Sequence, residues 1–448
     1  SAKNGWMGPD WKTPTNDISY LLDTIIKHIP APKAEPGSLQ MMISSLDFSS
    51  YVGRIAVGRV KRGSITWGQN VSLVKRDGTV QQSKVKELYV FEGLGKEKIK
   101  TPVEAGELCA ILGLDDFEIG DTVADFENPE QLTPIKVDEP TMSMLFTINN
   151  SPFFGKEGKY VTSRHLRDRL FAELERNLAM RIEETDSPDR MNVFGRGILH
   201  LSILIETMRR EGYELQVGQP QVIIKEIDGR KCEPFEDLQI NVPNEFVGDM
   251  MTILGERNAE LVTMDDDGIN TCLVYVIPSR GLIGFISNFM TMTKGYGIIN
   301  HTFKEYRPMI KGVVAERNIG VLVATSNGVA TSFALQKVEA HGTMFITPSL
   351  VTYEGMIVGE HRYPVDMAVN CTEEKPKNNI RSSTKEQTII LKAPRRMSLE
   401  ACLDYINSDE LVEITPNNIR MRKRILITAD RKKFDAHKKA ERLAEENA

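Results

Sequence analysis

The stretch Phe194-Gly195-Arg196-Gly197-Ile198-Leu199-His200-Leu201 decides how the middle of this chain folds. Its two glycines follow an apolar run and precede a helical pattern that extends to Arg210, which is typical of a strand that turns into a helix. Upstream, the spacing of apolar residues predicts a strand over 142–148 and a helix over 163–177, and a last strand is predicted over 217–224. This order predicts a split βαβ domain.

The following residues repeat the same plan. A strand predicted over 235–242 is followed by Pro243, a residue well suited to the first turn of a helix. Two more strands lead into a second helix over 282–292 and a final strand. We therefore expect two tandem ferredoxin-like domains with the order βαββαβ, over residues 139–222 and 233–306.

The N-terminal part has a different pattern. Residues 1–35 predict a short helix followed by the run Pro30-Ala31-Pro32, which is typical of a domain boundary. Residues 36–128 consist of short β-branched stretches separated by glycines, with a hairpin turn predicted at Asp77-Gly78. This pattern predicts a small β-barrel.

The C-terminal third, over 307–434, is predicted to be a β-rich domain with one helix whose N-cap is Ser398. A charged tail follows over 435–448. The predicted fold class is therefore multidomain α+β, with a β-barrel, two ferredoxin-like domains and a β-rich C-terminal domain.

The composition is ordinary for a soluble globular protein, since 41% of the 448 residues are hydrophobic and 26% are charged. No apolar run approaches the roughly 20 residues that cross a bilayer, and the N-terminus lacks the pattern of a secretory signal. We expect a cytoplasmic protein that does not contact membranes. The widely spaced cysteines predict neither disulfides nor a metal site and are expected in the core: Cys109, Cys232, Cys272, Cys371 and Cys402.

A GTP site needs a Gly-rich turn closed by Lys-Ser or Lys-Thr, whose amides and lysine hold phosphates while the hydroxyl binds magnesium. No such run occurs in the 448 residues. Asp265 to Gly268 fits an Asp-x-x-Gly pattern, but an acidic turn explains it better. The histidines lack the spacing of a metal-binding helix, and no Gly-x-Ser-x-Gly nucleophile motif is present. We therefore expect this chain to bind rather than to catalyse, with no cofactor or metal of its own.

Several motifs carry a likeness to translation factors. Gly53 to Val60 resembles the second-domain barrel of these factors, and Gly195 to Leu201 resembles the third-domain helix entry of elongation factor G relatives. Pro278 to Phe285 is similar to the fifth-domain motif of the BipA family, also called TypA. In the C-terminal third, further segments resemble the domain peculiar to that family: Tyr353 to Glu360, Asn379 to Arg381, Ser398 to Glu400, Asp409 to Glu413 and Ile419 to Arg424.

The junction between the two βαβ domains distinguishes among related families. Elongation factor G has an extra domain at this point, whereas only the segment from Gln221 to Pro234 intervenes here, which is too short for one. LepA resembles this chain in its direct junction, so a LepA-like factor is the alternative within the same class.

The resemblance implies a BipA/TypA chain without its GTPase domain, from which Ser1, Ala2 and Lys3 would be the last guanine-contacting motif and residues 4–30 the closing helix. The full-length parent would be a GTPase that uses GTP and Mg²⁺. The implied partner is the ribosome, with contacts to ribosomal RNA, A-site tRNA and ribosomal proteins, made by a monomer. The implied role is in ribosome assembly and in growth under cold or other stress.

The first RNA-binding candidate is the polar loop over 373–385, in which cations and amides are interleaved: Lys375, Lys377, Asn379, Arg381 and Lys385. Such a loop can place Lys and Arg against phosphates and small polar side chains against sugar hydroxyls. The resemblance implies that it reaches toward the peptidyl-transferase region and the A-site tRNA end. Composition alone favours the alternative of a merely solvated loop.

The second candidate is a basic strand and its flanks. Alternation along a strand predicts that Arg420, Arg422 and Arg424 share one face, where they would form a row of phosphate-binding guanidinium groups. The full set is Arg395, Arg396, Arg420, Arg422, Lys423, Arg424, Arg431, Lys432 and Lys433. A weaker patch on the predicted barrel, equally expected of any soluble barrel, comprises Arg54, Arg59, Lys61 and Arg62.

A hypothesis of a different class treats the chain as a protein-interaction scaffold. In that case the two βαβ sheets, and not the basic loop, would form the partner surface. Insensitivity of the complex to RNase and to added salt would favour the scaffold.

Overall fold

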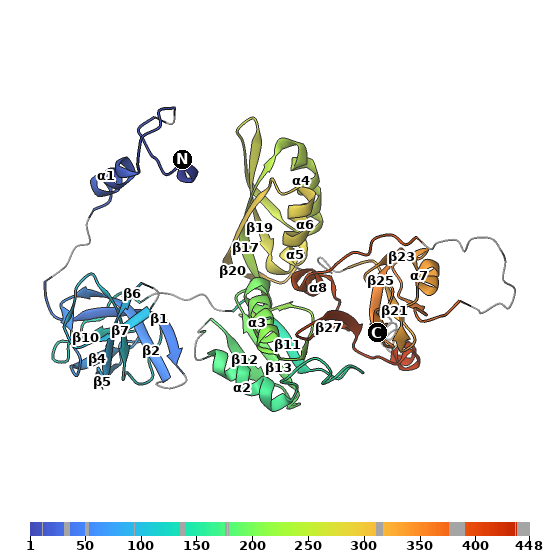
Figure 1. Ribbon diagram of the computed structural model, residues 1–448, viewed down its shortest axis with the longest axis horizontal. Coiled ribbons are helices and arrows are strands. Elements are labelled where there is room, and N and C mark those ends of the chain that lie inside the picture. The colour runs from blue at the N-terminus through green and yellow to red at the C-terminus, as the bar shows by residue number, and fades with distance from the viewer. Residues whose placement is uncertain are drawn as a thin grey trace. The chain divides into compact units, whose positions relative to one another are not determined.

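The computed structural model describes residues 1–10, 12–30, 36–49, 53–93, 95–134, 140–174, 177, 179–310, 317–375, 390–434 and 436. Residues Ser1–Val137 and Asp138–Ala448 form two compact units, which are described one after the other. Figure 1 shows the elements by label. In the part of the chain that the structure describes, no helix is both long and apolar enough to span a bilayer.

The first unit begins with two short helical elements, η1 (Ala2–Asn4) and α1 (Ser19–His28). None of the residues of α1 is buried. The strands that follow are β1 (Gln40–Ser49), β2 (Gly53–Arg62), β3 (Ser64–Ile65), β4 (Asn70–Val74), β5 (Val80–Lys84), β6 (Glu87–Glu92), β7 (Gly95–Ile99), β8 (Val103–Glu104), β9 (Leu108–Leu112) and β10 (Thr122–Ala124).

Eight of these strands form one antiparallel sheet in the order β5-β4-β10-β1-β2-β9-β6-β7, around a core that includes Met41, Val60 and Leu88. The predicted turn at Asp77-Gly78 is confirmed, because it joins the paired strands β4 and β5 and Gly78 has a φ of 87°. The fold class is as predicted, but the described strands form an open path and not a closed barrel. The two end strands are almost wholly exposed, so neither has an apolar face to bury against the other.

The second unit begins with the first predicted βαβ domain. Its elements are β11 (Met142–Ile148), α2 (Ser163–Leu174), β12 (Arg181–Glu184), β13 (Arg190–Gly195), α3 (Ile198–Glu211), β14 (Leu215–Val217) and β15 (Gln221–Val222). The sheet order β12-β13-β11-β14 confirms the ferredoxin-like plan. Helix α3 contributes Leu201, Leu204 and Ile205 to the core beneath this sheet.

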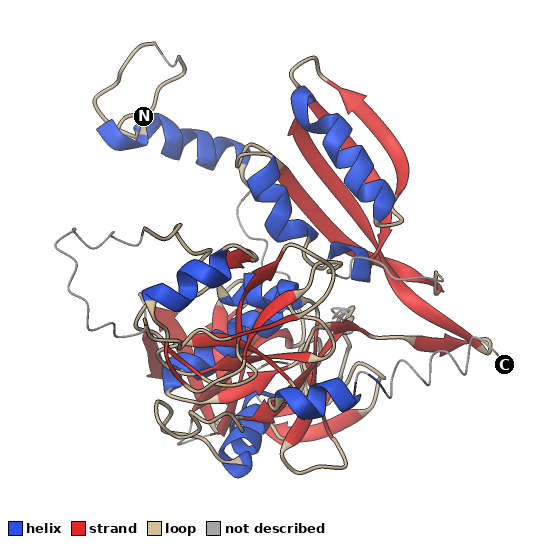
Figure 2. Cartoon of the chain, turned by 90° about the vertical axis from the view of Figure 1, so that its right-hand side faces the viewer, coloured by secondary structure: helices blue, strands red, loops and turns tan. Residues whose placement is uncertain are grey.

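The second βαβ domain has the same plan, with the sheet order β18-β19-β17-β20. Its elements are β16 (Lys225–Ile227), β17 (Arg230–Pro243), η2 (Asn244–Phe246), α4 (Val247–Glu256), β18 (Glu260–Asp266), β19 (Asn270–Pro278), α5 (Ser279–Leu282), α6 (Phe285–Met292) and β20 (Ile298–Pro308). Figure 2 shows helices along only one face of the long strands. Met250, Leu254, Phe285 and Phe289 from this helical layer pack against the sheet.

The helix predicted over 282–292 is interrupted, and the structure gives the cause. Arg257 Nη1 donates hydrogen bonds to the carbonyl oxygens of Gly281 at 2.6 Å and Ile283 at 2.8 Å, which takes these acceptors away from the helix. Gly284 then adopts a φ of 70°, a conformation that favours glycine, before α6 begins.

The C-terminal part contains a four-stranded sheet in the order β23-β25-β21-β26, with α7 beside it. Its elements are β21 (Val321–Ala324), β22 (Gly328–Val329), α7 (Ser332–Glu339), β23 (Gly342–Met344), β24 (Val351–Thr352), β25 (Ile357–His361), β26 (Met367–Val369), α8 (Leu399–Tyr405), β27 (Glu410–Ile414) and β28 (Ile419–Lys423). The Ser398 hydroxyl accepts a hydrogen bond from the Ala401 amide, which confirms the predicted N-cap.

The last two strands, β27 and β28, extend a sheet whose other strands come from residues much earlier in the chain. Strand β27 pairs antiparallel with β14, with Val412 opposite Val217, and β28 pairs with β27. The resulting seven-stranded sheet therefore combines residues 142–222 with residues 410–423. Val412, Ile414 and Met421 belong to the same apolar core as Leu204 and Ile205 of α3.

Candidate nucleic-acid interface

The basic strand lies inside the protein. The exposed fraction is 1% for Arg422 and 4% for Lys423, and the Arg420 side chain is 9% exposed. Strand β28 has one face on the apolar core, through Met421, and its other face against the loop that follows β11. The predicted row of exposed guanidinium groups on this strand is therefore wrong.

Arg422 donates to one side-chain amide oxygen and two backbone carbonyl oxygens, and no carboxylate accepts a hydrogen bond from it in the described part of the chain. Its Nη1 donates to Asn150 Oδ1 at 2.6 Å, while its Nε and Nη2 donate to the carbonyl oxygens of Lys423 and Arg424 at 3.0 and 3.2 Å. Burial lowers the pKa of Arg422, an effect that the nearby Tyr353 and Glu413 only partly offset. This arginine fastens β28 to the loop after β11.

Arg420 closes a second polar cluster between the same segments. Its Nη2 lies 2.6 Å from Glu157 Oε1, its Nη1 lies 3.2 Å from Glu413 Oε1, and its guanidinium lies 4.9 Å from the Phe153 ring centroid. Burial alone would raise the pKa of Glu157, but hydrogen bonds from Thr415, Arg420 and Asn418 lower it below its usual value. The cation predicted to meet RNA is thus neutralised internally.

Glu413 lies at the centre of this cluster and is fully buried. It accepts hydrogen bonds from the Tyr353 hydroxyl at 2.5 Å, Ser151 Oγ at 3.1 Å and Asn149 Nδ2 at 3.3 Å. Burial and the Glu413 carboxylate raise the pKa of Tyr353 well above its usual value. The sequence motifs contain Tyr353 and Glu413, but nothing in their spacing predicts that they meet.

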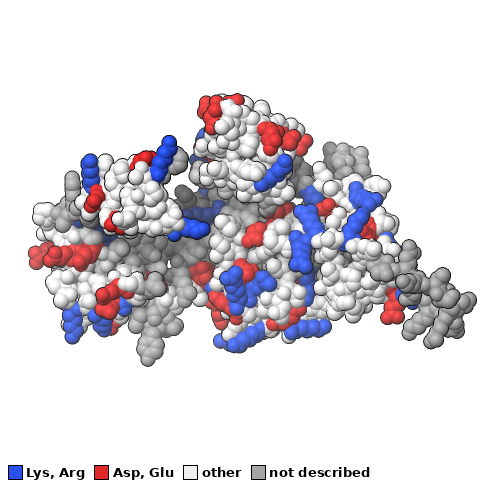
Figure 3. Space-filling model, turned by 45° about the horizontal axis from the view of Figure 1, so that its top comes forward, with Lys and Arg blue, Asp and Glu red and all other residues white. Residues whose placement is uncertain are grey.

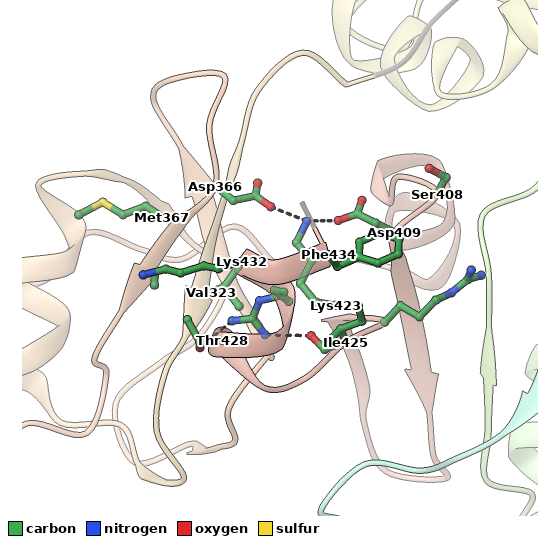
Figure 4. Close-up of a pocket in the computed structure, with 13 residues that line it drawn as sticks. Val323, Asp366, Met367, Ser408, Asp409, Lys423, Ile425, Thr428, Lys432 and Phe434 are labelled. Atoms are coloured by element: carbon green, nitrogen blue, oxygen red, sulfur yellow. Dashed lines mark hydrogen bonds and ion pairs between the residues drawn. The ribbon is translucent and has the colours of Figure 1, made fainter. Parts of the chain in front are cut away.

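Lys423 is surrounded by three carboxylates (Figure 4). Its Nζ lies 2.5 Å from Asp366 Oδ2, 2.7 Å from Asp409 Oδ2 and 2.9 Å from Glu410 Oε1. Burial would lower the pKa of Lys423, but Glu410, Asp409 and Asp366 raise it above its usual value. These carboxylates are close enough to one another to bind a metal ion, but the ammonium group takes that place.

Other predicted cations lie at the surface. Arg396 and Arg424 are exposed, and Arg395 is half-exposed with Glu360 Oε2 at 3.5 Å. Lys375 is exposed at the start of the predicted loop, whereas Lys377, Asn379, Arg381 and Lys385 lie outside the described residues. On the face shown in Figure 3, basic side chains are interspersed with acidic ones and do not form one continuous field.

Lys392 was not among the sequence-based candidates, whereas Lys432 belonged to the predicted basic run. Lys392 follows the segment 376–389 and its side chain is 81% exposed. Lys432 is exposed in the turn of helix that follows β28. High local charge beside a polar loop is the sequence signal that would have included Lys392.

The patch predicted on the first unit also contains two kinds of cation, some that contact other groups of the protein and some that are exposed. Arg54 is half-buried, donates to the Phe117 carbonyl oxygen at 2.8 Å and lies over the Phe117 ring. Arg62 Nη2 lies 2.6 Å from Glu130 Oε2. Arg59 and Lys61 are exposed, so only part of the predicted patch is available to a partner.

Residues at the start of the chain lie at the surface. Ser1, Ala2 and Lys3 are exposed, and the Ser1 ammonium donates to the Trp6 carbonyl oxygen at 2.9 Å. The five cysteines are free thiols, and four of them are buried, as expected of core residues. Burial raises the pKa of Cys109 and of Cys402 to about 12, so neither thiol is poised as a nucleophile.

Three family models match consecutive parts of this chain. They are elongation factor Tu domain 2 over residues 53–124, the elongation factor G C-terminus over 230–317, and the TypA/BipA C-terminal domain over 319–428. A crystal structure of a protein from Thermus thermophilus is similar with a TM-score of 0.42 and 15% identity, over 65% of this chain and 59% of that one.

Several relatives carry the name "Large ribosomal subunit assembly factor BipA". The protein from Bacillus subtilis is 48% identical, over 99% of this chain and 73% of the relative. The protein from Escherichia coli is 47% identical, over 97% of this chain and 72% of the relative. The TypA/BipA match in the C-terminal part decides between this family and a LepA-like factor.

These relatives correct the expectation that the chain is not an enzyme. Nearly all of the chain aligns with them, and it spans 73% of the Bacillus relative, so it is classified with that family of GTPases. The expectation rested on the missing phosphate-loop pattern, and the alignment with these relatives outweighs it. The chain belongs to the BipA/TypA family of translational GTPases.

Proposed function

We propose that this chain binds the ribosome and acts in assembly of the large ribosomal subunit. The name of its relatives supports this function, as does the match to the TypA/BipA C-terminal domain. The proposal includes contacts to ribosomal RNA and to the A-site tRNA end, made in the cytoplasm by a monomer. It also includes the role in growth under cold or other stress that the family resemblance implies.

The position of the exposed cations is the observation that supports the proposed RNA contact. Lys375 precedes the segment 376–389, and Lys392, Arg395 and Arg396 follow it. Cations at a surface release condensed counterions when they meet phosphates, which gives affinity without sequence specificity. We therefore assign RNA contact to these residues and, on sequence grounds, to Lys377, Asn379, Arg381 and Lys385 between them.

The buried cations have a different part in this function. Arg420, Arg422 and Lys423 bind carboxylates and carbonyl oxygens of the protein, so they are not available to phosphates. Their contacts fix β28 to the sheet that contains β11 and β14. They stabilise the fold around β28 and do not belong to the proposed RNA-binding surface.

GTP and Mg²⁺ are the ligands of a translational GTPase, and the described residues do not fit them. The carboxylate group at Asp366, Asp409 and Glu410 is closest to a cation site, but Lys423 Nζ already lies within 2.9 Å of all three. Ser1 to Lys3 are exposed in a short turn and do not enclose a base.

Ribosome co-sedimentation tests the proposal. The variant Lys375→Ala/Lys377→Ala/Arg381→Ala is expected to bind large subunits at least tenfold more weakly than the unchanged chain. The matched control Arg164→Ala/Arg210→Ala/Lys231→Ala removes three exposed cations elsewhere in the same unit and is expected to bind normally. Equal binding by both variants would remove the loop from the mechanism, and no sedimentation by any form would reject ribosome binding.

A protein-interaction scaffold is the second candidate, and one observation favours it. Every residue of β18 is exposed, including Leu261, Val262 and Met264 with exposed fractions of 44%, 56% and 48%. An exposed apolar edge strand is suited to a protein partner. Ribosomal association that survives RNase and high salt but is lost in Val262→Lys would favour this candidate.

A further inference from the structure

A cavity of about 470 Å³ lies beside the Lys423 cluster, between β26, the segment before β27 and the turn after β28. Its walls are formed by apolar side chains and by charged and hydroxyl groups, among them Val323, Met367, Ile425, Phe434, Asp409, Lys423, Thr428 and Lys432. This volume is in the range of pockets that hold small organic ligands.

The polar groups of the cavity are unevenly distributed (Figure 4). Asp409 and the Phe434 ring lie on one side of the Lys423 ammonium, and Lys432 lies on the other side, near Met367. Asp409 uses Oδ2 for Lys423, and its Oδ1 makes no hydrogen bond within the described part of the chain. The wall of the cavity therefore offers a hydrogen-bond acceptor from Asp409, an aromatic ring from Phe434 and a cation from Lys432.

One wall of the cavity contains a buried ammonium group. Lys423 is 4% exposed and lines the cavity, with its charge fixed by three carboxylates. Asp366 Oδ1 accepts a hydrogen bond from the Val321 amide, so this carboxylate is held by the sheet. The part of the wall formed by Lys423 and Asp366 is thus preorganised.

We propose that this cavity binds one nucleotide unit, with its base against Phe434 and its phosphate at Lys432. A planar base stacks on an aromatic ring, and its exocyclic amino group donates to Asp409 Oδ1. Adenine and cytosine have such an amino group and uracil does not, so uridine nucleotides bind more weakly. The Asp366 and Asp409 carboxylates repel additional phosphates, so a triphosphate binds no more tightly than a monophosphate.

This inference extends the proposed RNA contact. It rests on that contact only if the bound nucleotide is part of an RNA, because the nucleotide has two sources. It is either a free mononucleotide or a base of ribosomal RNA or tRNA turned out of its stack. The chemistry at Phe434, Asp409 and Lys432 is the same for both.

Calorimetric titration of the full chain with AMP, CMP, UMP, ATP and inorganic phosphate tests the free source. A hexameric RNA with one 2-aminopurine, followed by fluorescence, tests the RNA source. We expect AMP and CMP to bind at least tenfold more tightly than UMP, and ATP no more tightly than AMP. Phe434→Ala and Asp409→Asn are each expected to weaken binding about tenfold, which corresponds to about 1.4 kcal/mol.

Lys433→Ala is the matched control, since Lys433 is 82% exposed, pairs with Asp430 and does not line the cavity. Circular dichroism confirms that each variant is folded. Binding of AMP in this pattern supports the free source, and a 2-aminopurine signal that Phe434→Ala abolishes, without AMP binding, supports the RNA source.

Absence of both signals would overturn the inference, as would equal affinities for AMP and inorganic phosphate. Unchanged binding in Phe434→Ala would do the same. Ribosome co-sedimentation of Phe434→Ala separates the two proposals, because this variant keeps every cation assigned to the RNA surface. Normal sedimentation with no nucleotide binding would reject the pocket alone.

Discussion

Arg422 Nη1 donates a hydrogen bond of 2.6 Å to Asn150 Oδ1, a residue 272 positions earlier in the chain. The bond joins the last strand of the seven-stranded sheet to the loop after its central strand β11. Because the arginine is buried, this contact and the two to carbonyl oxygens satisfy groups that water cannot reach. A residue that the sequence suggests for RNA therefore stabilises the fold.

Replacement of Arg422 tests this structural role. Arg422→Ala leaves Asn150 and two carbonyl oxygens without their donor and creates a cavity. We therefore expect the free energy of unfolding to fall by about 3 kcal/mol. Hydrogen exchange of the β27 amides reports the loss locally, in a chain that need not unfold in two states. Arg424→Ala replaces an exposed neighbour and should change the free energy of opening, measured by hydrogen exchange, by less than about 0.5 kcal/mol.

The Tyr353 hydroxyl gives a second measure of the same junction. Tyr353→Phe removes the donor 2.5 Å from Glu413 Oε2 and leaves part of a buried carboxylate unsatisfied. The expected cost is about 1–3 kcal/mol in the same hydrogen-exchange measurement. Tyr363→Phe, at a tyrosine that is 67% exposed, serves as the control. Equal hydrogen-exchange protection of the β27 amides in Tyr353→Phe and Tyr363→Phe would contradict the role of Glu413 as a buried acceptor.

Acid should weaken this junction through Glu157. Its folded-state pKa is lowered from 4.5, so its contribution is present above pH 4.5 and is lost as the pH falls through the lower folded value. Protection of the β28 amides should decline below pH 4.5, and Glu157→Gln should flatten that decline. The exposed Glu127→Gln is the control, and a profile of Glu157→Gln as steep as that of the unchanged chain would refute the assignment.

His301 should respond in the opposite direction. Its Nδ1 lies 2.6 Å from Glu236 Oε2, and this hydrogen bond raises the pKa of His301 above 6.5, against the effect of burial. The pair therefore contributes stability below pH 6.5, which is lost as the pH rises through the raised value. NMR titration should give a pKa above 6.5 that returns toward 6.5 in Glu236→Gln. His341, whose ring takes no part in this pair, is an internal reference.

Local patterns predicted much of this fold. The alternation and helical spacing over 142–222 and 233–306 gave the repeated βαββαβ order, and Asp77-Gly78 gave its hairpin. Local patterns could not predict that β27 pairs with β14, because the partner lies about 200 residues away. Without that pairing, the alternation of Arg420 and Arg422 indicates an exposed face.

The site was harder to predict for a related reason. A cation on a solvated strand and a cation beside a buried carboxylate have the same sequence appearance, and only the fold brings Glu157 to Arg420. The break before Gly284 likewise depends on Arg257, which lies 24 positions before Gly281. Exposure of Lys375 and Arg396 agrees with the sequence, because polar flanks of long loops usually meet solvent.

The central claim is that exposed cations, and not the buried row on β28, bind ribosomal RNA. The salt dependence of binding to purified large subunits tests it most directly, with Lys375→Ala/Lys392→Ala/Arg396→Ala compared with the unchanged chain. Each lost phosphate contact should reduce the slope of log K against log salt by about 0.7–0.9, so the variant slope should fall by about 2–3. An unchanged slope and affinity would contradict the account.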